Sequence, residues 1–233
     1  MIGVVLAGGK GTRLLPITKY INKNILPVGA KPMIYYPLNT LISSGIKKII
    51  VVIGAHFGQQ VKEVVTSFGL DAQISFTVQK NYYGMPDAIY TVKNAVSIEP
   101  IIVVGGDNIF GGAYTDYISN FNFGEVSFLR KVDDPTKSAV PIYSKDLLID
   151  VIEKPKITKS KYAICGPHIF DNKVFKIIES LNPSSRGELE IVDLHKYYLK
   201  KRQLRLIKAS DYWIDAGTFD DLAKASYKLT HDN

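Results

Sequence analysis

Short apolar runs alternate with longer stretches in the first half of the chain, and apolar residues recur every three or four positions in the longer stretches. The runs at 2–6, 48–53, 74–79 and 101–104 are rich in β-branched residues and predict strands, three of them buried on both faces. The stretches at 32–44, 58–68 and 85–96 predict helices, with a kink or a later start where Pro37 falls inside the first. This alternation is typical of βαβ units and a mostly parallel sheet.

The pattern changes after Asp107. Four closely spaced strand-like segments follow, at 125–130, 139–143, 148–153 and 162–170, and indicate an antiparallel or mixed portion. Helices are predicted at 172–181, 188–200 and 218–230, with a short strand at 203–207 and Thr218 as the cap of the last helix. We therefore predict an α/β fold: one Rossmann-like domain with a mixed, mostly parallel sheet flanked by helices.

Composition narrows the class of protein. Hydrophobic residues make up 46% of the 233 positions and charged residues 22%, so a folded chain is expected. The formal charge of +7 suits an anionic ligand, although it also suits any soluble protein. The most basic stretch, 196–208, is interpreted as a solvated basic face, so no nucleic-acid partner is expected.

Cysteine usage and hydropathy indicate the compartment. The single cysteine, Cys165, excludes an intrachain disulfide and fits a reducing environment. No apolar run reaches the roughly 18–20 residues that span a bilayer, and the first residues lack the basic region of a signal peptide. We expect a cytoplasmic protein with no membrane partner.

The histidines give no sign of a metal centre. His56, His168, His195 and His231 are scattered without the short spacing of zinc ligands, so no zinc site is predicted.

A glycine-rich turn follows the first predicted strand, in the stretch GGKGTRLLP at 8–16. Successive backbone N–H groups in such a turn form a concavity that binds anions, phosphate above all. The P-loop pattern is missing because no glycine–lysine–threonine occurs. The dinucleotide fingerprint is also missing, because Leu14 stands at the position of its third glycine. The hypothesis of a dinucleotide-dependent oxidoreductase is therefore nearly excluded.

The loop belongs to a longer series of motifs. The segments GGDNIFGG, VIEKP, YAICGPHIFD, RGELEIVD and WIDAGTFDDL follow it in order at 105–112, 151–155, 162–171, 186–193 and 213–222. Together they resemble the sugar-1-phosphate nucleotidyltransferases over essentially the full chain, most closely the glucose-1-phosphate thymidylyltransferase type. That resemblance implies in-line attack of a sugar phosphate on the α-phosphorus of a nucleoside triphosphate, with release of pyrophosphate.

The resemblance implies a nucleotide site in the first half of the chain. In it, Arg13 neutralises the departing pyrophosphate, Lys23 contacts the nucleotide phosphates, and Gln79 with Gly84 reads the base. The implied nucleotide-binding residues are Leu6, Ala7, Gly8, Gly9, Gly11, Thr12, Arg13, Gln79, Gly84 and Asp107.

A magnesium site is implied at the end of the strand 101–104. Asp107 follows this strand at its carboxyl end, where ligands of open α/β sheets bind. The resemblance pairs it with Asp215, and two carboxylates with phosphate oxygens suit Mg²⁺.

The sugar phosphate is assigned to the second half of the chain. The resemblance implies that Glu153 contacts sugar hydroxyls and that Lys154, grouped with Arg13 and Lys23 as catalytic, contacts the phosphate. Gly166 and Ala139 complete the predicted site, and the Ala139 methyl is expected to restrict which sugars are accepted. Arg186 and Glu190 are expected to organise structure around the site.

The function expected from these residues is magnesium-dependent transfer from dTTP to a hexose 1-phosphate, glucose 1-phosphate first. The alternatives are a UTP-dependent enzyme and a non-catalytic nucleotide-sugar-binding protein. Residues 1–233 are expected to form one nucleotidyltransferase domain, with a nucleotide half at 1–110 and a sugar-phosphate half at 111–233. The closest type continues into further helices beyond the position of Asn233, so we expect a homo-oligomer smaller than its usual tetramer.

Overall fold

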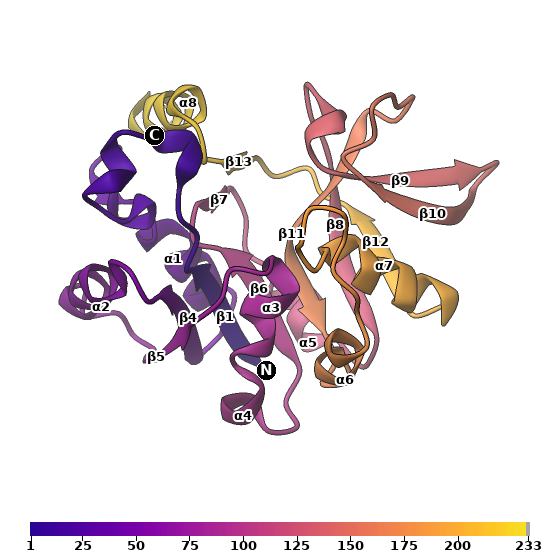
Figure 1. Ribbon diagram of the computed structural model, residues 1–233, viewed down its shortest axis with the longest axis horizontal. Helices are drawn as coiled ribbons and strands as arrows, with labels where there is room; N and C mark the ends of the chain where they lie inside the picture. Colours follow the sequence, from indigo (N-terminus) through magenta and orange to yellow (C-terminus); the bar gives the residue numbers. More distant parts are fainter. Residues whose placement is uncertain (232–233) are drawn as a thin grey trace. The chain divides into compact units, whose positions relative to one another are not determined.

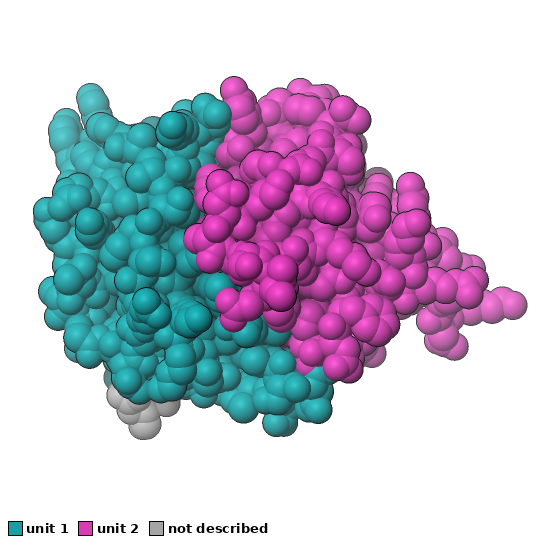
Figure 2. All heavy atoms as spheres, turned by 90° about the horizontal axis from the view of Figure 1, so that it is seen from below, with its two compact units in different colours: residues 1–82, 104–120, 211–233 teal, residues 83–103, 121–210 magenta. Residues whose placement is uncertain are grey.

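The computed structural model describes residues 1–231, which form two compact units. Unit 1 contains residues 1–82, 104–120 and the C-terminal segment from 211, and unit 2 contains residues 83–103 and 121–210. Figure 2 colours the two units separately. The C-terminal segment thus belongs to the same unit as the N-terminal strand, which brings residues around 13, 107 and 215 into one body. The single domain and its two sequence halves stay a prediction.

Unit 1 is built on three parallel strands. β1 (Ile2–Ala7) pairs with β4 (Lys48–Gly54), and β4 pairs with β5 (Gln73–Gln79), all in parallel register. These strands lie side by side in Figure 1. β1 and β4 are buried along nearly their whole length, which is why their sequences are continuous apolar runs.

Helices and short strands complete unit 1. Two antiparallel strand pairs occur in this unit, β2 (Pro27–Val28) with β3 (Lys31–Pro32) and β7 (Asn108–Phe110) with β13 (Trp213–Asp215). The helices of this unit are α1 (Tyr35–Ser43), α2 (Gly58–Ser67), α5 (Thr115–Ser119) and α8 (Phe219–His231), with 3-10 turns at Thr12–Leu14, Ile17–Lys19 and Lys23–Ile25.

Unit 2 is mainly antiparallel. β11 (Tyr162–Phe170) pairs antiparallel with β8 (Glu125–Lys131), with β9 (Ala139–Ser144) and with the start of β6 (Ile101–Gly105). β9 and β10 (Leu147–Glu153) form a long hairpin, visible in Figure 1, and β12 (Leu204–Lys208) adds a parallel strand to β8. The helices of this unit are α3 (Met85–Tyr90), α4 (Lys93–Val96), α6 (Val174–Glu179) and α7 (Ile191–Lys200), with a 3-10 turn at Pro135–Lys137.

The predicted α/β fold, parallel at first and mixed after Asp107, is confirmed. The helix predicted from residue 32 begins only at Tyr35, which places Pro37 in its first turn, where proline is tolerated. Thr218 caps α8 as predicted: its Oγ1 accepts a hydrogen bond from the Asp221 amide at 3.2 Å.

Three predicted boundaries were wrong. The helix predicted at 85–96 is two short helices, α3 and α4, and the helix predicted from 172 is the shorter α6. The helix predicted from 188 begins at Ile191 because residues 188–190 form a loop held by tertiary contacts, described below.

Candidate active site

The glycine-rich loop lies against the end of β5. A Cβ atom at Gly8 would be only 2.7 Å from Oε1 of Gln79, and Gln79 is buried. Glycine at position 8 is therefore what allows the loop backbone to approach this amide. Two residues predicted to bind nucleotide, one for phosphate and one for base, are neighbours in unit 1.

The loop presents Arg13 at the surface of unit 1. The Gly11 carbonyl accepts hydrogen bonds from the Leu14 amide (2.9 Å) and from Thr18 Oγ1 (2.8 Å), which fix the turn. The next side chain, Leu14, is fully buried in an apolar cluster with Met33, so its neighbour Arg13 is directed outward and is 57% exposed. Arg13 is thus held through its backbone, while its guanidinium stays accessible to an anion.

Lys23 and Asp107 form an ion pair in a largely buried setting. Lys23 Nζ donates to Asp107 Oδ2, and only 14% and 12% of these side chains is exposed. Burial alone would raise the pKa of Asp107, but the charge and hydrogen bond of Lys23 outweigh it and hold that pKa below its usual range. Asp107 is therefore ionised at neutral pH. The Gly9 backbone lies beside the Lys23 side chain: a Cβ there would be 3.5 Å from Lys23 Cε.

Two short strands bring the second carboxylate to the first. β7 follows Asp107 directly and pairs antiparallel with β13, in a register that sets Asp215 opposite Asn108. Trp213 Nε1 donates to Asn108 Oδ1 (3.0 Å), and the Ala216 amide donates to the Asp107 carbonyl (2.9 Å). The pairing of Asp107 with Asp215 therefore follows from backbone geometry.

Whereas the pKa of Asp107 is lowered, that of Asp215 is raised. Partial burial, followed by the nearby charge of Asp107, raises its pKa to about 6, although Arg13 and Lys23 pull it down. Arg13 approaches it at 3.7 Å, between a guanidinium nitrogen and Oδ2. Its other oxygen, Oδ1, is buried and has no hydrogen-bond partner among residues 1–231.

These groups fit a divalent cation. A buried carboxylate oxygen without a partner, beside an ionised carboxylate, is a poor arrangement on its own, since both charges repel. A small hard cation such as Mg²⁺ uses oxygen ligands of this kind and completes its shell with water and phosphate oxygens. Asp107 and Asp215 are the residues that would hold it.

The pKa of Asp215 predicts how stability changes with pH when metal is removed. A folded-state pKa raised from 3.8 to about 6 means that the carboxyl adds stability below pH 3.8 and that this contribution disappears by about pH 6. Because the side chain is 37% exposed, solvent screening reduces the effect to about 1 kcal/mol. In EDTA, Asp215→Asn should gain about 1 kcal/mol in unfolding free energy over the unsubstituted chain between pH 4 and pH 7.

Urea unfolding across that pH range measures the gain. Asp220→Asn, an exposed carboxylate in α8, is the matched control and should leave the pH profile unchanged. Parallel profiles for Asp215→Asn and the unsubstituted chain would contradict the raised pKa.

The end of β1 is hydrogen-bonded to the segments that carry Lys23 and Asp107. The Ala7 carbonyl accepts from Asn24 Nδ2 at 3.1 Å, and the Leu6 carbonyl accepts from the Gly106 amide at 2.9 Å. Nine of the ten predicted nucleotide-binding residues, all except Gly84, and the predicted metal ligands lie in unit 1. Their binding roles stay predictions.

Asn24 is a residue that the sequence analysis missed. It is fully buried, and its backbone amide donates to Asn22 Oδ1 at 2.9 Å, a bond that caps the 3-10 turn carrying Lys23. The signal available in the sequence was the N-K-N triplet around Lys23, whose asparagines bond to each other and to the Ala7 carbonyl.

The predicted sugar-phosphate residues lie in unit 2, around a network of charges. Lys154 Nζ is 3.5 Å from Glu153 Oε1, and an Arg186 guanidinium nitrogen is 3.7 Å from the same oxygen. Arg186 also makes a bidentate pair with Glu190, at 3.1 and 2.6 Å. Glu190 accepts from Ser184 Oγ at 2.7 Å, so this loop is rigidly cross-linked. These contacts agree with an organising role for Arg186 and Glu190.

Lys154 adopts a strained backbone conformation. Its φ is +41°, in the left-handed region that non-glycine residues seldom enter, and its amide donates to the Ser138 carbonyl at 3.1 Å. Strain of this kind costs about 1–3 kcal/mol and concentrates at functional positions. The phosphate contact of Lys154 stays a prediction.

Gly84 is fixed against the same loop. Its φ is +95°, and a Cβ there would collide with the Leu189 carbonyl oxygen. The Leu189 amide in turn donates to the Tyr83 carbonyl at 2.7 Å. The turn before α3 and the loop before α7 are therefore in direct backbone contact, which only glycine permits.

Gly84→Ala is expected to lower the unfolding free energy by about 3 kcal/mol, because it adds a collision to an unfavourable φ. Gly45→Ala is the matched control, since Gly45 also has a positive φ (+90°) but open space around it. Its loss should be about 1 kcal/mol, from the backbone alone. Equal losses in urea unfolding would show that the contact with Leu189 contributes nothing.

The two other predicted sugar-site residues, Gly166 and Ala139, lie on strands of unit 2, β11 and β9. The Gly166 carbonyl accepts from the buried guanidinium of Arg130 at 2.7 Å. Ala139 is buried in an apolar cluster with Val151 and Ile164, so its methyl packs into this core. Sugar contacts by these two residues stay predictions.

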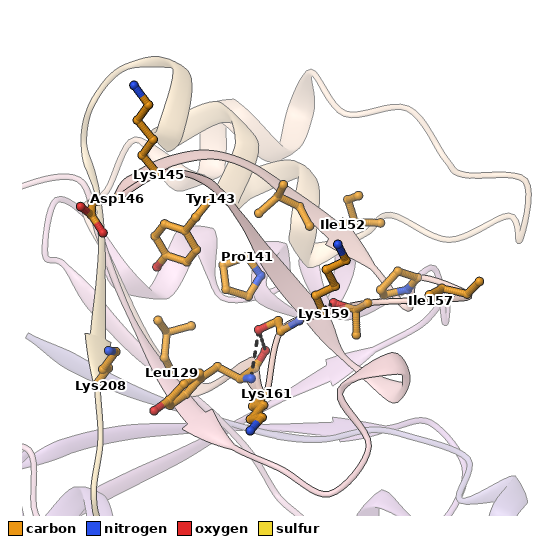
Figure 3. A pocket seen from close by; sticks show the side chains of 15 residues that line it. Leu129, Pro141, Tyr143, Lys145, Asp146, Ile152, Ile157, Lys159, Lys161 and Lys208 are labelled. Carbon is orange, nitrogen blue, oxygen red and sulfur yellow. Dashed lines mark hydrogen bonds between the residues drawn. The ribbon is translucent and has the colours of Figure 1, made fainter.

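A separate hollow of about 880 Å³ opens beside the β9–β10 hairpin of unit 2 (Figure 3). Its walls combine apolar side chains, including Pro141, Ile152 and Ile157, with lysines around the rim. None of the four predicted sugar-site residues lines it. The hollow is therefore formed by a different set of side chains from the predicted sugar site.

Comparison with known proteins places this geometry in a family. The nucleotidyl transferase family matches residues 2–232. Glucose-1-phosphate thymidylyltransferases from Neisseria meningitidis and Xanthomonas campestris are 34% and 37% identical, over 97% and 96% of this chain and 81% and 79% of theirs.

Solved structures give the same result. A protein from Bacillus anthracis assigned as a glucose-1-phosphate thymidylyltransferase, determined with sucrose, is 36% identical with a TM-score of 0.91, covering 100% of this chain and 97% of that one. A UDP-glucose pyrophosphorylase shares the fold at 21% identity and a TM-score of 0.88, covering 100% and 99%. Within residues 1–231, every helix is too short or too polar to cross a bilayer. The chain belongs to the nucleotidyl transferase family and is a sugar-1-phosphate nucleotidyltransferase.

Proposed function

We propose that the protein transfers a thymidylyl group from dTTP to glucose 1-phosphate, with Mg²⁺, and releases pyrophosphate. The observation that carries the proposal is the cluster of Arg13, Lys23, Asp107 and Asp215 in unit 1, beside the glycine-rich loop. The activity of the related glucose-1-phosphate thymidylyltransferases supports the choice of dTTP and glucose 1-phosphate.

The reaction needs positioning and positive charge more than covalent chemistry. A phosphate oxygen of the sugar attacks the α-phosphorus in line, and negative charge grows on the departing pyrophosphate. In this proposal the backbone N–H groups of the loop bind the triphosphate, and Gln79 at the end of β5 binds the base. Arg13, exposed and directed outward, neutralises the leaving group with a guanidinium that stays charged at every working pH.

Lys23 and the two aspartates act together. When bound, Mg²⁺ supplies positive charge to the phosphate oxygens. Asp107 and Asp215 hold the ion, and Lys23 keeps Asp107 ionised in its buried setting. Asp215, with its raised pKa, gives up its proton as the site is occupied.

Unit 2 contributes the residues that bind the sugar phosphate in this proposal. Lys154 contacts the phosphate, and Glu153, only 20% exposed and approached by both Lys154 and Arg186, accepts from sugar hydroxyls. A carboxylate held between two cations is fixed in orientation, as a group that binds sugar hydroxyls requires.

The test is pyrophosphate release from the purified protein with MgCl₂, crossing dTTP, UTP, CTP, ATP and GTP with a panel of sugar 1-phosphates. We expect release with dTTP and glucose 1-phosphate, dependent on both substrates and abolished by EDTA. Preference for UTP would replace the thymidylyl assignment with a uridylyl one. Nucleotide binding without release across the panel would show a non-catalytic binding protein.

A further inference from the structure

The hollow beside the β9–β10 hairpin lies entirely within unit 2. Its volume of about 880 Å³ falls in the range of about 300–1,000 Å³ that is typical of sites for small molecules. β8, the hairpin, the loop at 155–161 and the end of β12 each contribute to its walls. The proposed nucleotidyl transfer uses none of its lining residues, so the hollow is available to a different ligand.

Apolar side chains that the fold leaves partly uncovered form one wall of the hollow. Tyr143 on β9 and Ile152 on β10 are 47% and 38% exposed, and Ile157 in the following loop is 88% exposed. Pro141 lies on the same face of β9 as Tyr143, because side chains two residues apart on a strand share a face. Single exposed apolar residues are ordinary, but several around one concavity mark a binding surface.

Cationic side chains surround this apolar wall. The lysines of the rim are Lys145 in the hairpin turn, Lys159 and Lys161 in the loop before β11, and Lys208 at the end of β12. Among residues 1–231 none of the four forms an ion pair with a carboxylate, and Asp146 is the one acidic residue that lines the hollow. Lys208 Nζ lies 5.4 Å from the ring centroid of Tyr162, a cation–π contact that orients the lysine and leaves its charge uncompensated. The rim therefore attracts anions.

Hydrogen bonds hold the loop that carries two of these lysines. Ser160 Oγ donates to the Tyr162 carbonyl at 2.9 Å and accepts from the Tyr162 amide at 3.0 Å, the bonds drawn in Figure 3. The Lys161 carbonyl accepts from the amide of Val132, the residue after β8, at 3.2 Å. The wall is thus ordered before a ligand binds, which lowers the entropic cost of binding.

The arrangement of the lysines decides what size of anion fits. Figure 3 shows the four lysines at separate points around the hollow, with Tyr143 and Pro141 between them. An inorganic ion is too small to contact several of these lysines at once, and it gains nothing from the apolar wall. An organic anion can lie on the wall and still reach the rim.

We propose that this hollow binds a small amphipathic anion, whose apolar ring system lies on Pro141, Tyr143 and Ile152 and whose phosphate or carboxylate group pairs with lysines of the rim. Burial of the wall supplies the nonpolar part of the affinity, and the tyrosine ring gives a flat surface on which another ring stacks. The unpaired ammonium groups select for negative charge.

Isothermal titration calorimetry of the full chain separates the contributions of wall and rim with four probes: naphthyl phosphate, naphthoate, inorganic phosphate and naphthol. At least one of the two aromatic anions should bind saturably and at least about tenfold more tightly than inorganic phosphate or naphthol, because only these anions use both wall and rim. The tighter of the two gives the preferred head group. Equal affinity for inorganic phosphate and naphthyl phosphate, or no saturable binding of either aromatic anion, would overturn the proposal.

Two variants test the lining residues, and a third is the matched control. Lys159→Gln/Lys161→Gln and Tyr143→Ala should each weaken binding of the aromatic anion by at least about tenfold. Lys156→Gln/Lys200→Gln removes two exposed positive charges of unit 2 from outside this hollow and should bind like the unsubstituted chain. Circular dichroism checks that each variant is folded. An equal loss in the control would show a general attraction between the chain and anions, and the assignment to this hollow would be wrong.

A second measurement needs no variant. In the isotope-labelled, unsubstituted chain, the aromatic anion should shift the amide NMR signals of Tyr143 and of residues 157–162, and leave those of the glycine-rich loop in place. Shifts confined to the glycine-rich loop would place the anion in the proposed nucleotide site and overturn the proposal. Both measurements detect binding directly, so they do not depend on nucleotidyl transfer.

Discussion

Asp107→Asn is expected to lower turnover by at least about 1000-fold while the protein remains folded. The substitution keeps the shape of the side chain but removes the negative charge that pairs with Lys23 and raises the pKa of Asp215. A neutral amide is a weak ligand for Mg²⁺, so the proposed site loses one of its two carboxylates. The measurement is pyrophosphate release under saturating substrates, beside circular dichroism of the same sample.

The same variant has a second expected effect that separates charge loss from misfolding. The charge of Asp107 raises the pKa of Asp215, so its removal should bring that pKa down from about 6 toward the ordinary value. Because burial, the larger cause of the raised pKa, remains, urea unfolding in EDTA should then show a weaker pH dependence than the unsubstituted chain. Asp116→Asn, on exposed α5, is the control for both readouts. Unchanged turnover in Asp107→Asn would remove Asp107 from the metal site.

The parallel core of unit 1 could be predicted because burial on both faces leaves a direct record in the sequence. β1 and β4 are apolar along their length, and a strand of this kind is recognised without knowing its partners. The glycine-rich turn was equally readable, since dense glycines have few other uses. What these patterns could not give was the identity of the ligand, which came from resemblance.

The pairing of Asp107 with Asp215 could not be predicted from hydrophobic periodicity either. β7 and β13 have three residues each, too few for any alternation to be detected, and the register that brings the carboxylates together arises from their hydrogen bonds. Helix boundaries failed for a related reason. Residues 188–190 have helical character in sequence, but contacts of Leu189 with Tyr83 and of Glu190 with Arg186 hold them as a loop.

The buried histidines show the limit of spacing arguments most directly. No zinc site was predicted from His168 and His195, because zinc motifs usually place ligands a few residues apart. In the structure a strand and a helix bring them together with Glu125, and only long-range packing of unit 2 reveals the cluster. Spacing along the sequence therefore does not show which buried polar side chains meet in the core of an α/β fold.

Arg13→Ala is expected to lower kcat by about 100- to 1000-fold and to change the KM for glucose 1-phosphate by no more than about threefold. The guanidinium is 57% exposed and held in place by the buried side chain of Leu14, so its removal should not disturb the fold. Its charge matters most as pyrophosphate departs, which is a transition-state effect and so appears in kcat.

Steady-state kinetics of pyrophosphate release measure the split, with Lys19→Ala, an exposed cation in the following turn, as the control. Arg13→Lys keeps the charge but loses the planar guanidinium, so its kcat should lie between that of Arg13→Ala and that of the unsubstituted chain. Arg13 also lowers the pKa of Asp215, so its loss should move the acidic limb of the activity profile to higher pH. An effect confined to KM would mean that Arg13 binds substrate equally in the ground and transition states, and the leaving-group role would then fall to Lys23 or to the loop backbone.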